Sequence, residues 1–383
     1  MALTKVSTAV VDMSGNTGAL EIAKGTTTER DAISSPTLGL LRANTTDHTM
    51  EVYTDNSGTP GWRVLKEGGN AIAAPLTVEY LVVAGGGAGG NGMGAGGGAG
   101  GLIHNYGGTA LTLTAGNNYT VTIGAGAAGV STNTRVNGSN SVFDTLIAIG
   151  GGGGSSLQMQ RNSGPTTGAD GGSGGGSGAS DNGNYSGGAA LQPSSSSGGF
   201  GNAGGSQNGN STYYPGAGGG GAGAVGTTVS SYDNGGNGGI GLQVDIDGNN
   251  YYWAAGGGGD GYSVGNGGNG GTGGGGGGAV YAQYPGSGGG SAINSGGNGG
   301  GGPNTRGGNG GANTGSGGGG ASWTNAAGGN GGSGIVILRY PNSYQITFTA
   351  GASPAFSSSN ATVGTDTVTT IIAGSGIITF SLV

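Results

Sequence analysis

Residues 264–274 read Val-Gly-Asn-Gly-Gly-Asn-Gly-Gly-Thr-Gly-Gly, so the non-glycine residues Asn266, Asn269 and Thr272 are spaced three apart. A polyproline II-type helix has three residues per turn and no internal hydrogen bonds. Glycines would fill two of its faces, and one small side chain would line the third. Such helices pack closely only where the touching faces lack a Cβ, as at the collagen axis. The same spacing recurs at Asn234, Asn237 and Ile240, at Ala327, Asn330 and Ser333, at Asp170 and Ser173, and at Ala88 and Asn91.

This spacing predicts a bundle of packed polyglycine II helices, a rigid and chemically bland scaffold that displays its loops. The competing interpretation is disorder, because Gly-, Ser- and Asn-rich segments are typical of flexible linkers. Each of the 106 glycines also loses much backbone entropy when it is ordered. Disordered chains are usually rich in charge, however, and only 7% of these residues are charged. We therefore expect order, supplied by backbone hydrogen bonds between helices rather than by apolar burial.

Composition excludes several classes of protein. The chain has no cysteine, so disulfides and thiolate metal sites are excluded. A net charge of −7 and a pI near 4.6 argue against a nucleic-acid partner. No long apolar run follows Met1, and no stretch approaches the ~20 apolar residues of a membrane helix. We expect a soluble protein without a signal peptide.

The distribution of charge and glycine divides the chain into residues 1–76, 77–340 and 341–383. All three lysines fall in the first segment. The expected fold class is all-β with packed polyglycine II helices: a small β module, then a β-sandwich with the glycine-helix bundle, then a C-terminal β element. The first segment predicts a hairpin of Thr49–Tyr53 and Trp62–Leu65 around a turn at residues 55–61. This hairpin is too small to bury a core alone, so we expect it to trimerise or to dock onto another protein.

Alternating and apolar runs predict the remaining strands. Asp247-Gly248 favours a type I′ hairpin turn between residues 241–246 and 250–253. We expect strands to feed directly into the glycine helices, and helix signals are almost absent. The expected strands are 78–84, 110–114, 119–123, one or two within 141–149, and 334–340, followed in the last segment by 344–349, 367–372 and 376–382.

No residue pattern indicates catalysis. His48 and His104 lie in no recognisable catalytic setting, so we expect no enzyme activity and no cofactor. Asp245-Ile-Asp-Gly-Asn249 resembles the start of a calcium loop, but its twelfth position is Gly256 instead of the required glutamate. We interpret that stretch as a hairpin turn and expect no metal. Arg306-Gly-Gly is a single triplet, which we assign to a loop.

Aromatic residues interrupt the glycine tracts at several places. Tyrosine and tryptophan supply a large contact area at low entropic cost, as in antibody loops. The alternative is local packing, in which the rings only cover the ends of glycine helices. As a group they favour a binding surface. The candidate residues are Tyr213, Tyr214, Tyr251, Tyr252, Trp253, Tyr281, Tyr284 and Trp323.

A pattern of about 40 residues in the first segment runs through Gly25–Arg30, Ser35–Arg42, Asn44–Thr46, Glu51–Tyr53 and Trp62. It resembles a module common in the fibres and other virion proteins of tailed bacteriophages. The resemblance implies five candidate attachment residues: Arg30, Arg42, Asn44, Tyr53 and Trp62. Residues 80–87 and 334–340 resemble the borders of a glycine-rich domain of phage fibres, and the glycine tracts resemble the tip adhesins of T-even phages.

The resemblance implies a phage tail-fibre or receptor-binding protein, located on the virion and homotrimeric. Residues 1–76 would attach to other virion tail proteins. The aromatic loops would stack on host surface polysaccharide or pack against an outer-membrane protein, with weak contacts added by avidity. Three alternatives stay open: a capsid decoration or head-fibre protein, a bacterial surface adhesin, and, more remotely, a polysaccharide depolymerase.

Overall fold

The chain forms two compact units, residues 1–74 and 75–383. We call them the first unit and the second unit. The computed structural model describes residues 23–56, 59–65, 71–72, 75–156, 167–178, 184–208, 214–230, 234–262, 265–323, 326–349 and 354–383.

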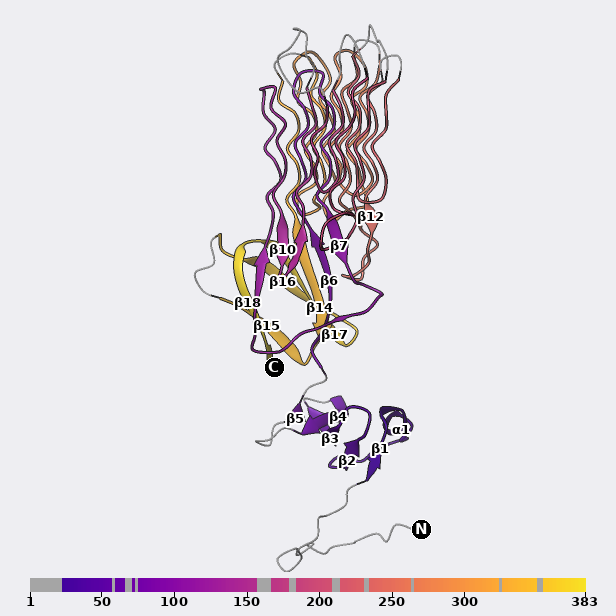
Figure 1. Ribbon diagram of the computed structural model, residues 1–383, viewed down its shortest axis with the longest axis vertical. Helices are drawn as coiled ribbons and strands as arrows, with labels where there is room; N and C mark the ends of the chain where they lie inside the picture. Colours follow the sequence, from indigo (N-terminus) through magenta and orange to yellow (C-terminus); the bar gives the residue numbers. More distant parts are fainter. Residues whose placement is uncertain are drawn as a thin grey trace, which may run out of the picture. The chain divides into compact units, whose positions relative to one another are not determined.

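The first unit is a five-stranded sheet with one short helix (Figure 1). The predicted hairpin is confirmed, with Tyr53 opposite Trp62. The predicted turn at residues 55–61 was too long, because the strands extend to Asn56 and start again at Thr59. Residues 57–58 lie outside the described residues. Helix α1 (Thr27–Asp31) was not predicted. It begins with a capping box in which Thr26 Oγ1 accepts the N–H of Glu29, and the Glu29 carboxylate accepts the N–H of Thr26. The strands, in spatial order, are β1 (Lys24–Gly25), β2 (Leu41–Asn44), β3 (Thr49–Asn56), β4 (Thr59–Leu65) and β5 (Ala71–Ile72).

The second unit contains two larger sheets and a short hairpin. One sheet has the order β16-β17-β14-β6-β7 with β8 beside β6, and the other has the order β11-β10-β9-β18-β15. The strands are β6 (Thr77–Val83), β7 (Leu102–His104), β8 (Leu111–Thr112), β9 (Asn118–Thr122), β10 (Ser141–Phe143), β11 (Leu146–Ala148), β12 (Leu242–Gln243), β13 (Tyr252–Trp253), β14 (Ile335–Pro341), β15 (Tyr344–Phe348), β16 (Ser357–Val363), β17 (Asp366–Ala373) and β18 (Ser375–Leu382).

Aromatic rings join the two sheets face to face. Tyr340 of β14 meets Phe380 of β18 edge-on, with ring centroids 5.2 Å apart. Tyr80 of β6 lies 6.1 Å from Phe143 of β10. All four residues come from inward positions of strands that alternate their side chains between two faces. The predicted β-sandwich is confirmed.

The last segment differs from the expectation of a separate C-terminal element. Strand β17 lies between β16 and β14, and β18 lies between β9 and β15. Residues 341–383 therefore complete both sheets of the sandwich and belong to the second unit. The serine-rich strand β16 was not predicted, because its side chains are almost all exposed and show no apolar alternation.

The short hairpin of β12 and β13 is confirmed, but its turn is not type I′. A type I′ turn needs positive φ at both central residues, whereas here only Gly248, with φ 84°, is positive. The N–H of Gly248 bonds to the carbonyl of Asp245, so the turn closes one residue earlier, with Gly248 after it in the left-handed conformation. Trp253 at the end of this hairpin packs in the main core with Leu81, Ile246 and Ile337.

The hydrogen bonds of the glycine segments are those of neither an α-helix nor a β-strand. The partners of their backbone N–H groups repeat every three residues. In residues 85–90, each N–H bonds to one of three neighbouring segments in turn. The N–H groups of 85 and 88 bond to residues 139 and 136, those of 86 and 89 to 332 and 329, and those of 87 and 90 to 98 and 95. Donors that rotate by a third of a turn per residue define polyglycine II geometry. A β-strand would direct them alternately to two neighbours.

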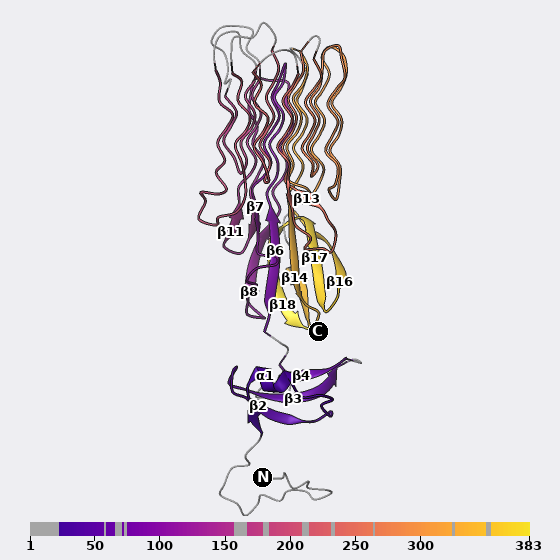
Figure 2. The same cartoon turned by 90° about the vertical axis from the view of Figure 1, so that its right-hand side faces the viewer.

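Segment 94–101 shows the packing inside the bundle. It donates hydrogen bonds to three segments and accepts them from three others, so six helices surround it. Figures 1 and 2 show these segments running side by side from the sheets to the loops. The six neighbouring segments are 84–90, 149–155, 173–176, 217–220, 257–260 and 315–321.

Steric contact explains the glycines of this bundle. A Cβ at Gly96 would lie 1.9 Å from the carbonyl oxygen of Gly257, and one at Gly100 would lie 2.1 Å from that of Ala84. No side chain fits at such distances, because the neighbouring atoms are backbone and cannot move aside. The predicted polyglycine II bundle is therefore confirmed.

Candidate binding surface

The loop end of the second unit is the end of the bundle away from the sheets (Figure 2). Strand β6 continues into residues 84–90, which turn at 91–93 and return through 94–101 to β7. Several aromatic residues gather at turns of this end. The direction in which each glycine segment runs decides which end of the bundle its turn occupies. At this end, side chains from four separate glycine tracts come together.

Four rings form what we call the loop-end cluster: Tyr214, Tyr262, Tyr281 and Trp323. Tyr262 stacks on Trp323 at 6.0 Å and meets Tyr214 edge-on at 5.5 Å. Tyr281 lies 5.1 Å from Trp323. Met93 is fully buried against this cluster, in contact with Tyr214, Tyr262 and Trp323. Three of these four rings were predicted. Tyr262 was missed, although it interrupts a glycine tract in the same way.

The backbone beneath the cluster is strained. Met93 and Trp323 have φ of 50° and 53°, in the left-handed region that side chains other than glycine rarely adopt. Such conformations persist where the surrounding packing determines them, and they gather at functional sites. Beside the cluster, Tyr284 is 75% exposed and Tyr281 is 36% exposed, so aromatic surface remains open to solvent.

The remaining predicted rings are not part of this surface. Tyr213 lies outside the described residues. Tyr251, Tyr252 and Trp253 lie at the opposite, sheet end of the bundle. Trp253 is fully buried, with its Nε1–H bonded to the carbonyl of Val244 at 3.0 Å, and Tyr251 packs edge-on against it. At this end the structure supports the packing alternative for Tyr251 and Trp253. Tyr252 is half-buried in the same strand, and all three residues lie away from the loop end.

Asp260 is a buried carboxyl near the loop end that sequence analysis did not single out. Its N–H bonds to Gly94 and its carbonyl accepts from Gly216, which fixes it within the glycine lattice. Oδ1 of Asp260 has no hydrogen-bond partner among the described residues. Burial raises the pKa of this carboxyl well above its usual value. Asn91, Ser177 and Gln207 are also buried, and each has a polar side-chain atom that bonds to none of the residues the structure describes.

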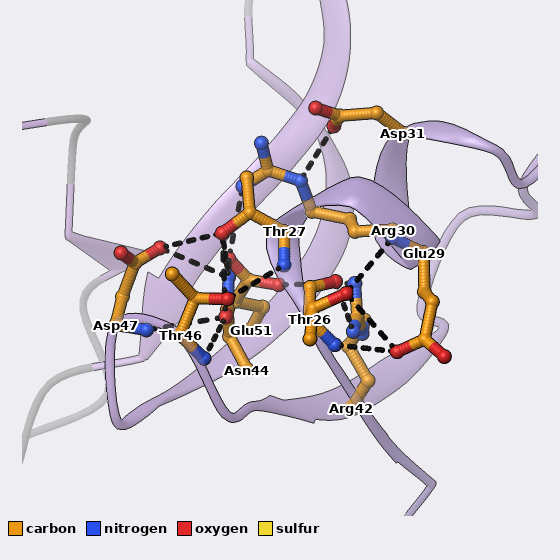
Figure 3. A network of polar contacts seen from close by, with 10 residues as sticks. All are labelled: Thr26, Thr27, Glu29, Arg30, Asp31, Arg42, Asn44, Thr46, Asp47 and Glu51. Atoms are coloured by element: carbon orange, nitrogen blue, oxygen red, sulfur yellow. Dashed lines mark hydrogen bonds and ion pairs between the residues drawn. The ribbon is translucent and has the colours of Figure 1, made fainter.

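In the first unit, three of the predicted attachment residues, Arg30, Arg42 and Asn44, meet around one buried carboxylate (Figure 3). The side chain of Glu51 is only 2% exposed. Its Oε1 accepts hydrogen bonds from Arg30 Nη1 at 3.0 Å and from Asn44 Nδ2 at 2.9 Å. Its Oε2 lies 3.7 Å from Arg42 Nη1. We call these four residues the Glu51 network.

The aromatic members of the motif complete this arrangement. Tyr53 and Trp62 meet edge-on at 5.4 Å, and the guanidinium of Arg42 lies 5.7 Å from the Trp62 ring centroid. Hydrogen bonding to Asp31 and then to Glu51 raises the pKa of Arg30. The motif residues are therefore brought together by contacts that hold the unit itself, since no buried apolar side chain is found among its described residues. Their contacts with a partner stay a prediction.

The described residues contain no group of three or more His, Cys, Asp or Glu side chains that could hold a metal ion. Asp247 Oδ1 accepts the N–H of Asn249 within the turn, and His104 stacks on Phe200 at 5.4 Å. Burial lowers the pKa of His104. In the part of the chain that the structure describes, no helix has the length and apolar character needed to cross a membrane.

Comparison with known protein families assigns a family to the middle of the chain. Residues 69–303 match the family described as the glycine-rich domain, and the chain belongs to this family. No curated protein and no solved structure matches the chain.

Proposed function

We propose that this protein is a bacteriophage tail-fibre or receptor-binding protein that attaches the virion to the host cell. The observation that carries the proposal is the loop-end cluster with the exposed Tyr284 beside it. The glycine helices are fixed by hydrogen bonds to as many as six neighbours, so they offer a stiff support. A rigid scaffold that presents aromatic residues on turns is a common arrangement of binding proteins.

The proposed ligand is a surface polysaccharide or an outer-membrane protein of the host. Exposed rings stack on the apolar faces of sugars and also form the centres of protein interfaces. In a homotrimer, three loop ends would act together, and weak single contacts would add by avidity.

The first unit is proposed to attach the chain to other virion proteins. Its motif residues support this proposal by their resemblance to fibre modules. Four large apolar side chains on the same unit are exposed, between 37% and 61%, and would supply contact surface for a virion partner or for other copies of the chain. They are Ile33, Leu38, Leu40 and Leu41.

The test is binding to cells of the strain that the parent phage infects. Purified protein should bind these cells and block phage adsorption. The double variant Tyr281→Ala/Tyr284→Ala should weaken binding about tenfold or more, as expected for two aromatic contacts at an interface centre. Leu191→Ala serves as the control, because Leu191 is 41% exposed and precedes Gln192, which bonds to Ile149 at the sheet end.

Unchanged cell binding by the double variant would reject the loop end as the receptor contact. If the wild-type protein binds no cells, and gold-labelled antibodies against it mark the capsid in electron microscopy, the protein is a capsid decoration protein instead.

A further inference from the structure

A groove runs along the side of the glycine-helix bundle between segments 296–301 and 305–311. Its volume is about 480 Å³. The polar side chains at its border are Asn298, Thr305, Arg306 and Asn309, and the rest of its surface is glycine backbone. We propose that this groove binds a glycine-rich segment of another polypeptide in the polyproline II conformation, as one more helix of the lattice. This proposal does not depend on the proposed function.

The first argument is that two backbone N–H groups at the groove have no acceptor among the described residues. In segment 296–301, the N–H groups of 296 and 299 bond to residues 289 and 286, and those of 297 and 300 bond to 309 and 306. The third position of the repeat is Asn298, whose N–H meets no acceptor among the described residues. In segment 305–311, residues 308 and 311 donate to 277 and 274, and 310 donates to 330, but the N–H of Asn309 has no such acceptor.

The second argument is what fills the equivalent positions inside the bundle. Around segment 94–101, every donor direction ends at the carbonyl of another glycine helix. Three donor directions repeat every turn, and a turn of this helix rises ~9 Å, from three residues at 3.1 Å each. An occupant with the same rise and with glycine on its touching faces would present carbonyls to Asn298 and Asn309 at the same repeat.

The third argument is that the border of the groove is already ordered. Oδ1 of Asn298 accepts the N–H of Gly288 at 2.9 Å, and Oδ1 of Asn309 accepts the N–H of Asn330 at 2.9 Å. Both carboxamides are therefore held by neighbouring helices before any ligand arrives. Little side-chain entropy is then lost on binding, which favours affinity.

The chemistry of the occupant follows from the contact distances in the lattice. Inside the bundle, a Cβ on a touching face would meet a carbonyl oxygen at about 2 Å, as at Gly307 against Gly319 O, 1.9 Å. The ligand must therefore carry glycine at two of every three positions. A polysaccharide is the competing occupant, because the groove ends near an aromatic ring. The carbonyl of Thr305, a groove residue, accepts the N–H of Ser322, and Ser322 precedes Trp323 of the loop-end cluster.

The experiment uses the full-length protein and a fluorescein-labelled peptide of five Asn-Gly-Gly repeats, followed by fluorescence anisotropy. A peptide of five Asn-Ala-Gly repeats is the ligand control. Gly297→Leu places a side chain in the groove, where a Cβ would lie 3.2 Å from Asn309 N. Gly290→Leu is the matched control, because Gly290 is also exposed and a Cβ there meets nothing within 4 Å.

We expect the Asn-Gly-Gly peptide to bind, and binding to weaken about tenfold or more for the alanine peptide and for Gly297→Leu. Gly290→Leu should bind as the wild type does. In the wild-type protein, the peptide should also shift the backbone amide NMR signals of Asn298 and Asn309, a result that does not depend on how either variant folds. Absence of binding, equal binding of the alanine peptide, unshifted Asn298 and Asn309 signals, or displacement of the peptide by dextran would overturn the proposal.

Discussion

Oδ1 of Asn237 accepts the backbone N–H of Asn269, the residue that faces it on the neighbouring glycine helix, at 2.8 Å. The same relation joins Asn234 to Asn266 at 2.8 Å, and Asn269 in turn accepts the N–H of Ser287 at 2.9 Å. These residues occupy the third position of the repeat, which faces solvent. The asparagine carboxamide thus supplies the carbonyl that a missing outer helix would have supplied, and this explains why the third residue is so often asparagine.

This relation predicts the effect of removing one carboxamide. Asn237→Ala should lower the free energy of unfolding by about 1 kcal/mol, because one hydrogen bond at the edge of the bundle is lost. Urea unfolding of the purified protein measures the change. Asn117→Ala is the control, since Asn117 is exposed and its side chain makes no hydrogen bond with the described part of the chain. Equal stability of Asn237→Ala and wild type would mean that water replaces the carboxamide without cost.

Glycine inside the lattice should tolerate no methyl group. Gly96→Ala places a Cβ 1.9 Å from Gly257 O, and we expect a loss of about 3 kcal/mol or more, or failure to fold. Gly290→Ala should be neutral or stabilising by roughly 0.5 kcal/mol, because its site is open and alanine restricts the unfolded chain. Thermal unfolding followed by circular dichroism compares the two. Similar losses at both positions would reject lattice sterics as the cause.

Asp260 should make stability depend on pH. Burial raises the pKa of its carboxyl in the folded state, so its contribution is fully present below the unfolded pKa, near 3.9, and is lost as pH rises through the folded pKa. Asp260→Asn removes this loss. The variant should gain stability over wild type as pH rises from about 4 towards neutrality, by at most ~1.4 kcal/mol per pH unit. Parallel unfolding curves from pH 4 to pH 8 would show that the carboxyl is solvated.

The Glu51 network should dominate the stability of the first unit. Glu51→Gln leaves the buried guanidinium of Arg42 without its counter-charge, and we expect the unit to lose about 3–5 kcal/mol. Asp31→Asn should cost less than about 1 kcal/mol, since the Asp31 side chain is 61% exposed. Limited proteolysis at residues 23–65, with the second unit as internal reference, distinguishes the variants. Equal protection of both would contradict a structural role for the network.

Much of the fold could be predicted from the sequence, because its strongest signals are local. The three-residue glycine repeat determines which faces lack a Cβ, and the apolar runs at β6 and β14 are typical of strands buried on both faces. Helix α1 was missed although Thr26 and Glu29 form a capping box, since a five-residue helix has no apolar period. Strand β16 was missed for a similar reason.

The site was less predictable because it depends on which end of the bundle each turn reaches. Aromatic residues that interrupt glycine tracts look alike in the sequence, yet Trp253 is buried at the sheet end while Trp323 belongs to the loop-end cluster. The direction of each glycine segment decides this. The burial of Asp260 has no signal in the sequence at all, since it arises from segments near Gly94 and Gly216.

The most direct test of the lattice is NMR detection of its hydrogen bonds in the purified, deuterated protein, through couplings between amide nitrogens and carbonyl carbons. The account predicts that three consecutive residues couple to three different segments: Gly85 to Ser139, Gly86 to Gly332, and Gly87 to Gly98. Couplings from Gly85 and Gly87 to a single neighbouring segment would be the pattern of a β-strand and would contradict the polyglycine II bundle.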